Sequence, residues 1–390
     1  MEFFAPGTKI DFMRIRRPII ALSLMGMALG IVSWFAPGPN FGIDFSGGTE
    51  LQLAFQGKIA GGEVRKALES LGYKRPDVVA VAGKSNEYII RVSEVSALGD
   101  AEKKKVEAAL PGKLPTAFPA DPAKRADGSL QAVTWSPGGD KLSLDLDAPV
   151  ATDELTSILA SLGVRVRSVA QFGKEQDYRY EAQLVGVADK LVASLKEKLS
   201  DRGPGDPLRV EWVGPKAGAQ LRDAAIQSLL YSIVFIMVYV AFRFDLRFAP
   251  GGVVALLHDA LLTVAFVVFT RLEFNLQTVA AILTIVGYSI NDTIVVFDRI
   301  RENMGRLKDH SLLDLINLST SQTLSRTIIT SGTTVLSLVA LVYWGTPVIR
   351  DLAITLIFGI GVGTYSSIYI AAPVTEWMDK RFYNKAAAAR

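Results

Sequence analysis

The chain has 390 residues, of which 49% are apolar and 21% are charged, and its mean hydropathy is +0.28. It is too apolar for a soluble domain alone and too charged in places to lie in a membrane throughout. We therefore predict a protein with both membrane-spanning and soluble segments. A formal net charge of +3, without Lys/Arg clusters interleaved with aromatic residues, gives no reason to expect nucleic-acid binding. With no cysteine and only two histidines, neither disulfides nor a metal site nor a cofactor is expected.

The first apolar run covers residues 18–36 and follows four basic residues between Lys9 and Arg17. Its flanks resemble a signal peptide, but a Pro-Gly-Pro turn follows instead of a small-residue cleavage site, and the run is long enough to span a bilayer. We therefore predict a cytoplasmic N-terminus over 1–17 and an uncleaved transmembrane helix over 18–36.

The segment 37–221 is polar, carries most of the acidic residues and alternates strand-like with helix-like patterns. Helices over 63–72 and 154–163 have matching apolar spacing and both end in Leu-Gly, which predicts a duplicated unit. In each half, strands and then a second amphipathic helix follow, over 100–110 in the first half and 188–199 in the second.

This order of elements is that of a split βαβ sandwich, so a ferredoxin-like α+β domain is predicted, possibly duplicated. Residues 49–55 and 208–213 are predicted as its outer strands. A stretch rich in Pro, Gly, Ala and Asp, over 111–141, is predicted to link the two halves.

Five further apolar runs lie near the C-terminus, over about 224–242, 252–270, 276–297, 323–344 and 349–374. Each is long enough to cross a bilayer, so the chain is predicted to have six spans. Residues 222–376 would form the membrane part with the first span, and 377–390 a cytoplasmic tail.

Positive charge in the short loops predicts the orientation. Basic residues gather at the N-terminus, near Arg243 and Arg247, over 299–308 and in the tail. Because cytoplasmic loops carry an excess of Lys and Arg, both ends are predicted inside and residues 37–221 outside the cytoplasm. The apolar stretch 311–318 is too short to span and is predicted to lie on the membrane surface.

Asp292 stands inside the fourth predicted span, where a charged side chain costs about 2.5 to 3.5 kcal/mol on insertion scales. Thr284, Gly287, Tyr288 and Asn291 recur at helical spacing with it and are predicted to share its face. An acid at this depth is expected to face a partner or a water-filled path, which favours proton carriage over a structural role.

Five motifs stand near the predicted spans: FGIDFSGGT over 41–49, VGPKAG over 213–218, His258 with Asp259, the stretch 287–303, and TLSRT over 323–327. Together they resemble the SecF family of bacterial protein-export membrane subunits. The resemblance implies a six-helix unit of the RND superfamily in the bacterial inner membrane, in contact with membrane lipid. It also implies that the chain works with SecD and the SecYEG channel on a secreted polypeptide. The exported segment looks longer than the usual single SecF domain.

The resemblance also implies a proton pathway that includes Asp292 and Arg326. Helical rise places these two residues at similar depth in antiparallel spans. We add Asn291, next to Asp292, to the predicted proton pathway. His258 and Asp259 in the third span are added too, although a hydrogen bond that packs helices is as good an interpretation of this pair as a proton relay.

Asp44, Gly47 and Gly48 mark where the chain passes from the first span into the exported domain. Glycine permits positive φ angles, so we predict a structural turn in preference to a ligand site. Small and hydroxyl residues that recur in spans five and six, among them Gly359, Gly363 and Ser366, are predicted to serve close helix packing.

Two other functional classes remain open. An intramembrane aspartyl protease needs two membrane acids, which Asp259 and Asp292 could supply, but the Gly-x-Gly-Asp pattern of that family is missing, so no enzymatic activity is predicted. A half-size RND-type exporter of lipids or small molecules would share the six-helix unit and the intramembrane acid. The partner that the chain binds distinguishes this exporter from an export subunit.

Overall fold

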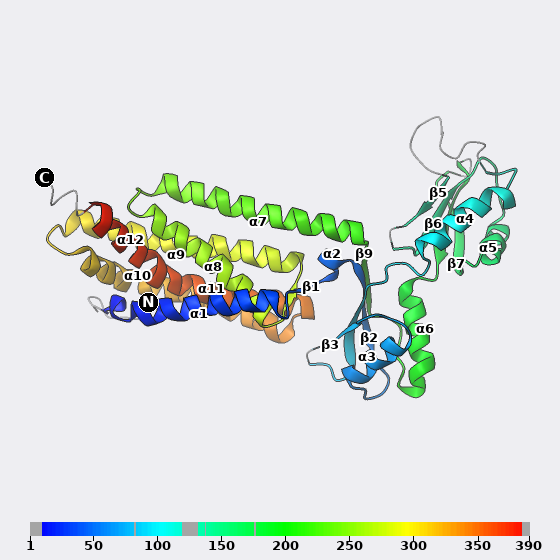
Figure 1. Ribbon diagram of the computed structural model, residues 1–390, viewed down its shortest axis with the longest axis horizontal. Helices are drawn as coiled ribbons and strands as arrows, with labels where there is room; N and C mark the ends of the chain where they lie inside the picture. The colour runs from blue at the N-terminus through cyan, green and yellow to red at the C-terminus, as the bar shows by residue number, and fades with distance from the viewer. Residues whose placement is uncertain (1–9, 82, 119–131, 137, 175–176, 384–390) are drawn as a thin grey trace. The chain divides into compact units, whose positions relative to one another are not determined.

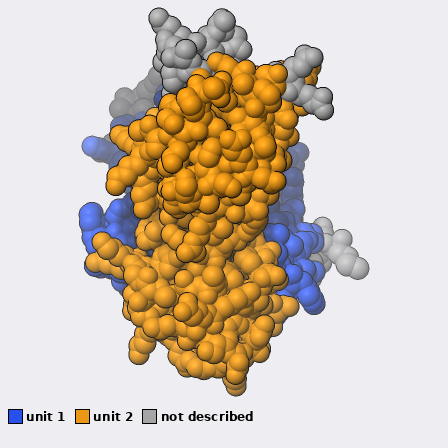
Figure 2. Space-filling view, turned by 90° about the vertical axis from the view of Figure 1, so that its right-hand side faces the viewer, with its two compact units in different colours: residues 1–42, 222–390 blue, residues 43–221 orange. Residues whose placement is uncertain are grey.

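The computed structural model describes residues 10–81, 83–118, 132–136, 138–174 and 177–383. The chain divides into two compact units, Ile43–Leu221 and a second that combines Met1–Gly42 with Arg222–Arg390 (Figures 1 and 2). Residues 1–9, part of the predicted linker and the end of the predicted tail lie outside the described residues.

The described residues contain six helices that are long and apolar enough to cross a membrane, which confirms the predicted six-span architecture. They are α1 (Arg16–Phe35), which follows the short η1 (Phe12–Ile15), α7 (Pro215–Arg243), α8 (Ala249–Phe269), α9 (Leu276–Arg306), α10 (Leu312–Trp344) and α11 (Pro347–Ser366). The last helix continues through a π-helical turn η4 (Ser367–Ala371), α12 (Ala372–Met378) and a second π-helical turn η5 (Asp379–Tyr383).

Small residues allow α9 and α11 to pack closely at the centre of this bundle. A Cβ atom added to Gly359 would lie 2.2 Å from Cδ1 of Ile285, and one added to Gly363 would lie 2.8 Å from Cβ of Ser289. Neither position has room for a side chain, so these glycines serve close packing, as the sequence predicts. A two-residue parallel pairing of β1 (Asn40–Phe41) with β10 (Glu273–Phe274) links the ends of two spans.

The stretch 311–318, predicted to lie on the membrane surface, is continuous with the fifth span. These residues form the first turns of α10, whose N-terminus is capped by Ser311 Oγ accepting from the Asp314 N–H. No proline interrupts the helix, and the hydroxyl groups of Ser321 and Thr323 bond back onto it by donating to the carbonyls of Asn317 and Ser319. The helix therefore continues well beyond the thickness of a bilayer.

The first sheet of the Ile43–Leu221 unit has four antiparallel strands in the order β3-β4-β2-β9. These are β2 (Gly48–Ala54), β3 (Asp77–Ala80), β4 (Glu87–Val92) and β9 (Arg209–Val213), and α3 (Gly61–Ser70) and α6 (Val187–Leu199), followed by η3 (Ser200–Arg202), accompany them. Leu51 and Leu53 of β2 pack with Leu68 of α3 and Leu191 of α6, and all four side chains are fully buried.

The second sheet has the same pattern of neighbours, in the order β5-β6-β8-β7. Its elements are β5 (Val133–Trp135), β6 (Lys141–Asp145), β7 (Val166–Phe172) and β8 (Arg179–Leu184), with α4 (Asp100–Lys113) and α5 (Thr152–Ser161). Leu110 of α4 and Leu159 of α5 share its core with Leu142 and Leu144 of β6.

The duplication is present, but the predicted membership of the two second helices is wrong. Helix α4 follows the strands of the first sheet yet packs in the core of the second, whereas α6 follows the second sheet and packs in the core of the first (Figure 1). The strand that follows each helix belongs to the same sheet as the helix. Strand β5, after α4, pairs with β6 of the second sheet, and β9, after α6, pairs with β2 of the first. The predicted linker over 111–141 contains strand β5 of the second sheet, so the prediction that this stretch only joins the two halves is wrong.

Candidate functional site

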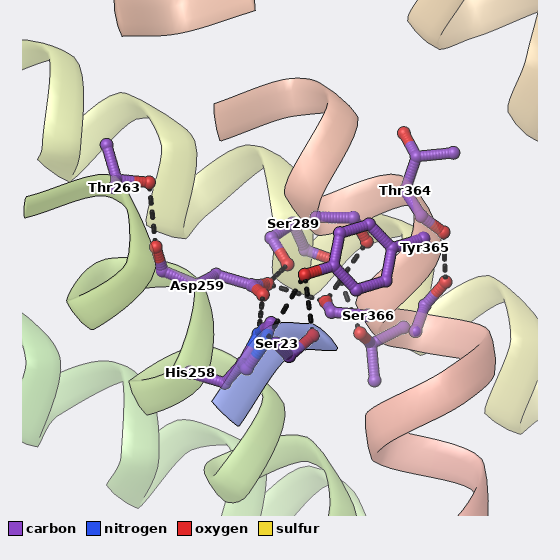
Figure 3. A network of polar contacts seen from close by, with 11 residues as sticks. Ser23, His258, Asp259, Thr263, Ser289, Thr364, Tyr365 and Ser366 are labelled. Carbon is purple, nitrogen blue, oxygen red and sulfur yellow. Dashed lines mark hydrogen bonds and ion pairs between the residues drawn. The ribbon is translucent and has the colours of Figure 1, made fainter. Parts of the chain in front are cut away.

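Asp259 lies at the centre of a buried polar network within the helix bundle (Figure 3). Its exposed fraction is 0%. Oδ1 accepts from Nδ1 of His258 at 2.7 Å, and Oδ2 accepts from Oγ of Ser366 at 2.7 Å and from Oγ of Ser289. Three donors compensate for much of the cost of removing a carboxylate from water. The side chain of Asp259 thereby joins α8 to both α9 and α11.

The network continues from His258 to α1. The Nε2 atom of His258 lies 3.5 Å from the hydroxyl of Tyr365, which lies 2.9 Å from Oγ of Ser23. The imidazole and phenol rings meet edge to face, with their centroids 5.8 Å apart. A carboxylate can only accept, so in the tautomer of His258 that donates to Asp259 through Nδ1, the other ring nitrogen, Nε2, can accept from Tyr365. A line of hydrogen bonds therefore runs from Ser23 to Asp259.

Asp292 has a different environment one turn along α9 from Ser289. Its exposed fraction is 3%, and the described residues offer no hydrogen-bond partner to its Oδ2. A carboxyl group at membrane depth needs a counter-charge, a proton or water. Asp292 Oδ2 can therefore still accept a hydrogen bond, whereas both carboxylate oxygens of Asp259 already accept one or more.

The other two candidates, Asn291 and Arg326, are exposed on α9 and α10. Within the described chain, no ion pair joins Arg326 to Asp292. The predicted polar face of α9 is divided, since Thr284, Gly287 and Asn291 are exposed whereas Asp292 is buried. Asp292 thus lies at the border between the packed interior and an exposed polar surface.

Asp44 lies in the short helix α2 (Ile43–Ser46), not in the predicted turn, and Gly47 and Gly48 follow this helix directly. Gly47 and Gly48 have φ angles of 70° and 127°, the positive values that the sequence predicts. A Cβ atom on Gly47 would lie 2.8 Å from Cα of Pro215, and one on Gly48 would lie 2.5 Å from the carbonyl oxygen of Val92. Both glycines therefore let the start of β2 approach neighbouring backbone closely.

Comparison with known proteins places these features in one family. Residues 195–381 match the model described as "Protein export membrane protein SecD/SecF, C-terminal", and residues 32–59 match the SecD/SecF GG motif. The protein translocase subunit SecF of Magnetococcus marinus is 37% identical over 388 residues, which cover 100% of this chain and 98% of that protein. This chain belongs to the SecF family. The SecF of Koribacter versatilis is 34% identical over 98% of this chain and 95% of its own length.

Solved structures of SecDF share the fold of this SecF-family chain. The crystal structure of SecDF from Thermus thermophilus, described as a translocon-associated membrane protein, has a TM-score of 0.63 and 29% identity over 97% of this chain. SecDF in a super-membrane-facing form has a TM-score of 0.56 and 28% identity over 100% of this chain. This chain spans 40% and 41% of those two SecDF chains, respectively.

Sequence reasoning missed most partners of Asp259. Ser366 was expected to serve helix packing, and it also donates a hydrogen bond to the acid. Ser23, Ser289 and Tyr365 lie on three different helices, and the register in which those helices pack brings them together. Helical periodicity reports one face of one helix, so it gives no signal for contacts between helices.

Proposed function

We propose that this chain acts as a SecF subunit in protein export across the bacterial cytoplasmic membrane, driven by proton uptake at Asp292. The observation that carries the proposal is the burial of Asp292 without a donor for its Oδ2 among the described residues. Such a group responds strongly to gaining or losing a proton, because either form must find new partners. Asp259, with three donors, instead fixes the helices around it.

A second membrane protein is expected to cover the polar surface next to Asp292. The exposed side chains there are polar or charged, and they are Thr284 and Asn291 on α9 with Arg326, Thr330, Thr333 and Ser337 on α10. Polar side chains within a bilayer normally face protein or water and not lipid tails. The related crystal structure is of SecDF, and this chain spans 40% of it, so SecD is the proposed occupant.

Protonation acts as a switch in this proposal. A proton moving inward gains about 2.3 kcal/mol per 100 mV from the potential, and this energy is useful only if the two protonation states favour different conformations. Ionised Asp292 draws Arg326 toward it, and protonation removes that attraction, so α9 and α10 shift against each other. The exported unit transmits the change to a secreted polypeptide that leaves through SecYEG.

The proposed orientation places both chain ends in the cytoplasm and residues 37–221 outside it. Arg243, Arg299, Arg301 and Lys380 lie near the helix ends assigned to the cytoplasmic side. No enzymatic step is required, because the proton gradient supplies the energy.

The test is export into membrane vesicles with and without an imposed proton gradient. Asp292→Asn keeps the shape of the side chain and removes its charge, so we expect SecD binding and membrane insertion to persist while stimulation by the gradient is lost. Arg326→Ala should have the same effect, and Arg326→Lys a milder one.

Full stimulation of Asp292→Asn by the gradient would show that this acid does not carry the proton. A pull-down in mild detergent tests the assembly separately. Recovery of SecD and SecY supports the export role, whereas recovery of this chain alone would support a half-size exporter of lipids or small molecules.

A further inference from the structure

The structure contains a cavity of about 520 Å³ where α9 ends and α10 begins. It is bounded on one side by the connection between the two helices and on another by η5 at the end of the last helix. The residues that line it are Arg247, Met304, Leu307, Lys308, His310, Ser311, Leu312, Leu313, Leu315, Asp379 and Lys380. All of them belong to one compact unit, and none of them takes part in the Asp259 network.

Positive charge exceeds negative charge in the lining. Arg247, Lys308 and Lys380 contribute three cations, and Asp379 contributes one acid. Arg247 forms an ion pair with Asp379, and Lys380 Nζ donates to Glu376 Oε1 at 2.6 Å. Lys308 is exposed, and the described residues form no ion pair with it. The cavity lining therefore carries more positive charge than Asp379, its one acidic residue, neutralises.

Two further groups of donors favour an anion. The Nε atom of Arg247 is buried, and no hydrogen-bond acceptor for it lies in the described chain. Helix α10 begins at the cavity, and the first N–H groups of a helix have no acceptor within it. Ser311 caps the N–H of Asp314, which leaves those of Leu312 and Leu313 at the positive end of the helix dipole.

The remaining walls are apolar. They are formed by aliphatic and thioether side chains, those of Met304, Leu307, Leu312, Leu313 and Leu315. These residues lie near the ends of helices that are long and apolar enough to cross a membrane. A free phosphate ion would use the cations and leave this apolar surface unused, whereas a phospholipid would use both.

We propose that this cavity binds the phosphate headgroup of an anionic phospholipid through Arg247, Lys308, Lys380 and the N-terminus of α10, with an acyl chain against the leucines. Basic pockets between helices at a membrane face recognise anionic lipids by this chemistry. The bound lipid joins α9 and α10 to the end of the last helix. This role goes beyond the proposed function and does not depend on it.

The experiment measures lipid binding to the purified full-length chain in detergent by native mass spectrometry. The probes are phosphatidylglycerol, phosphatidylcholine of the same acyl chains, and inorganic phosphate. Lys308→Gln removes a cation that the described residues do not pair, so the fold should persist. Arg306→Gln is the matched control, because Arg306 is a neighbouring cation that pairs with Glu302 at 3.0 Å and does not line the cavity.

We expect phosphatidylglycerol to bind in preference to phosphatidylcholine, and Lys308→Gln to weaken phosphatidylglycerol binding about fivefold while Arg306→Gln changes it less than twofold. Millimolar phosphate should displace little of the lipid. Equal binding of the two lipids, equal effects of the two substitutions, or displacement by phosphate alone would each overturn the proposal.

Discussion

Asp259 and Asp292 are two buried acids in one helix bundle, and they differ in their hydrogen bonding. Asp259 accepts three hydrogen bonds, so Asp259→Asn should remove charge-assisted bonds and lower the free energy of unfolding by about 1 to 3 kcal/mol. Thermal unfolding of the purified chain in detergent measures this loss. Asp292→Asn is the matched control and should leave the melting temperature nearly unchanged, since no hydrogen bond to Oδ2 is lost. A larger loss for Asp292→Asn than for Asp259→Asn would reverse the assignment.

The glycines of α11 provide a second contrast between neighbouring positions. A Cβ atom at Gly359 would lie 2.2 Å from Ile285, whereas one at Gly361 would meet no atom within 4 Å. Gly359→Ala should therefore cost about 1 to 3 kcal/mol through overpacking, and Gly361→Ala should be neutral or slightly stabilising. Melting temperatures of the two variants check this expectation. If both variants melt alike, α9 and α11 do not pack as closely as described.

At this scale the sequence predicts residue types better than residue partners. The cost of an acid in lipid was enough to single out Asp292, and glycine spacing was enough to predict close packing. The hydrogen bonds of Asp259 to Ser289 and Ser366 depend on the register between α8, α9 and α11, which no single-helix pattern contains.

Among the elements, helix α6 offers a direct test of the exchanged arrangement. Leu191 is fully buried in the core of the first sheet, so Leu191→Ala should cost about 2 to 5 kcal/mol and speed amide hydrogen exchange in β2 and β4. Leu159→Ala in α5 is the matched control and should speed exchange in β6 and β8. Faster exchange in β6 and β8 after Leu191→Ala would restore the arrangement expected from chain order.

The elements themselves were predictable because their apolar periodicity is strong, but their partners were not. Chain order favours packing of helices α4 and α6 on the nearer sheet. The two sheets share one order of neighbours, so the strand pattern does not show which core each helix completes. The start of α10 was also misplaced, because the apolar stretch 311–318 is too short to span alone, whereas the structure makes it continuous with the fifth span.

For the whole molecule, the proposed topology can be tested without a partner. A reporter enzyme active only outside the cytoplasm should work when fused near Gly139 and fail when fused near Lys308, because the basic loops are retained inside. Enzymatic activity in cells carrying each fusion is the measurement. Activity of the Lys308 fusion would contradict the proposed orientation of all six spans.

The exchanged helices also set the order in which the exported unit matures. Strand β2 is synthesised early. Its partner at the edge of the sheet, β9, ends at Val213 and is synthesised after every element of the second sheet. The second sheet is contained within one uninterrupted stretch of chain and can close as soon as β8 exists, whereas the first must close a loop around it. Newly made chains should therefore pass through a stage in which the later sheet is folded and the earlier one still waits for its last strand.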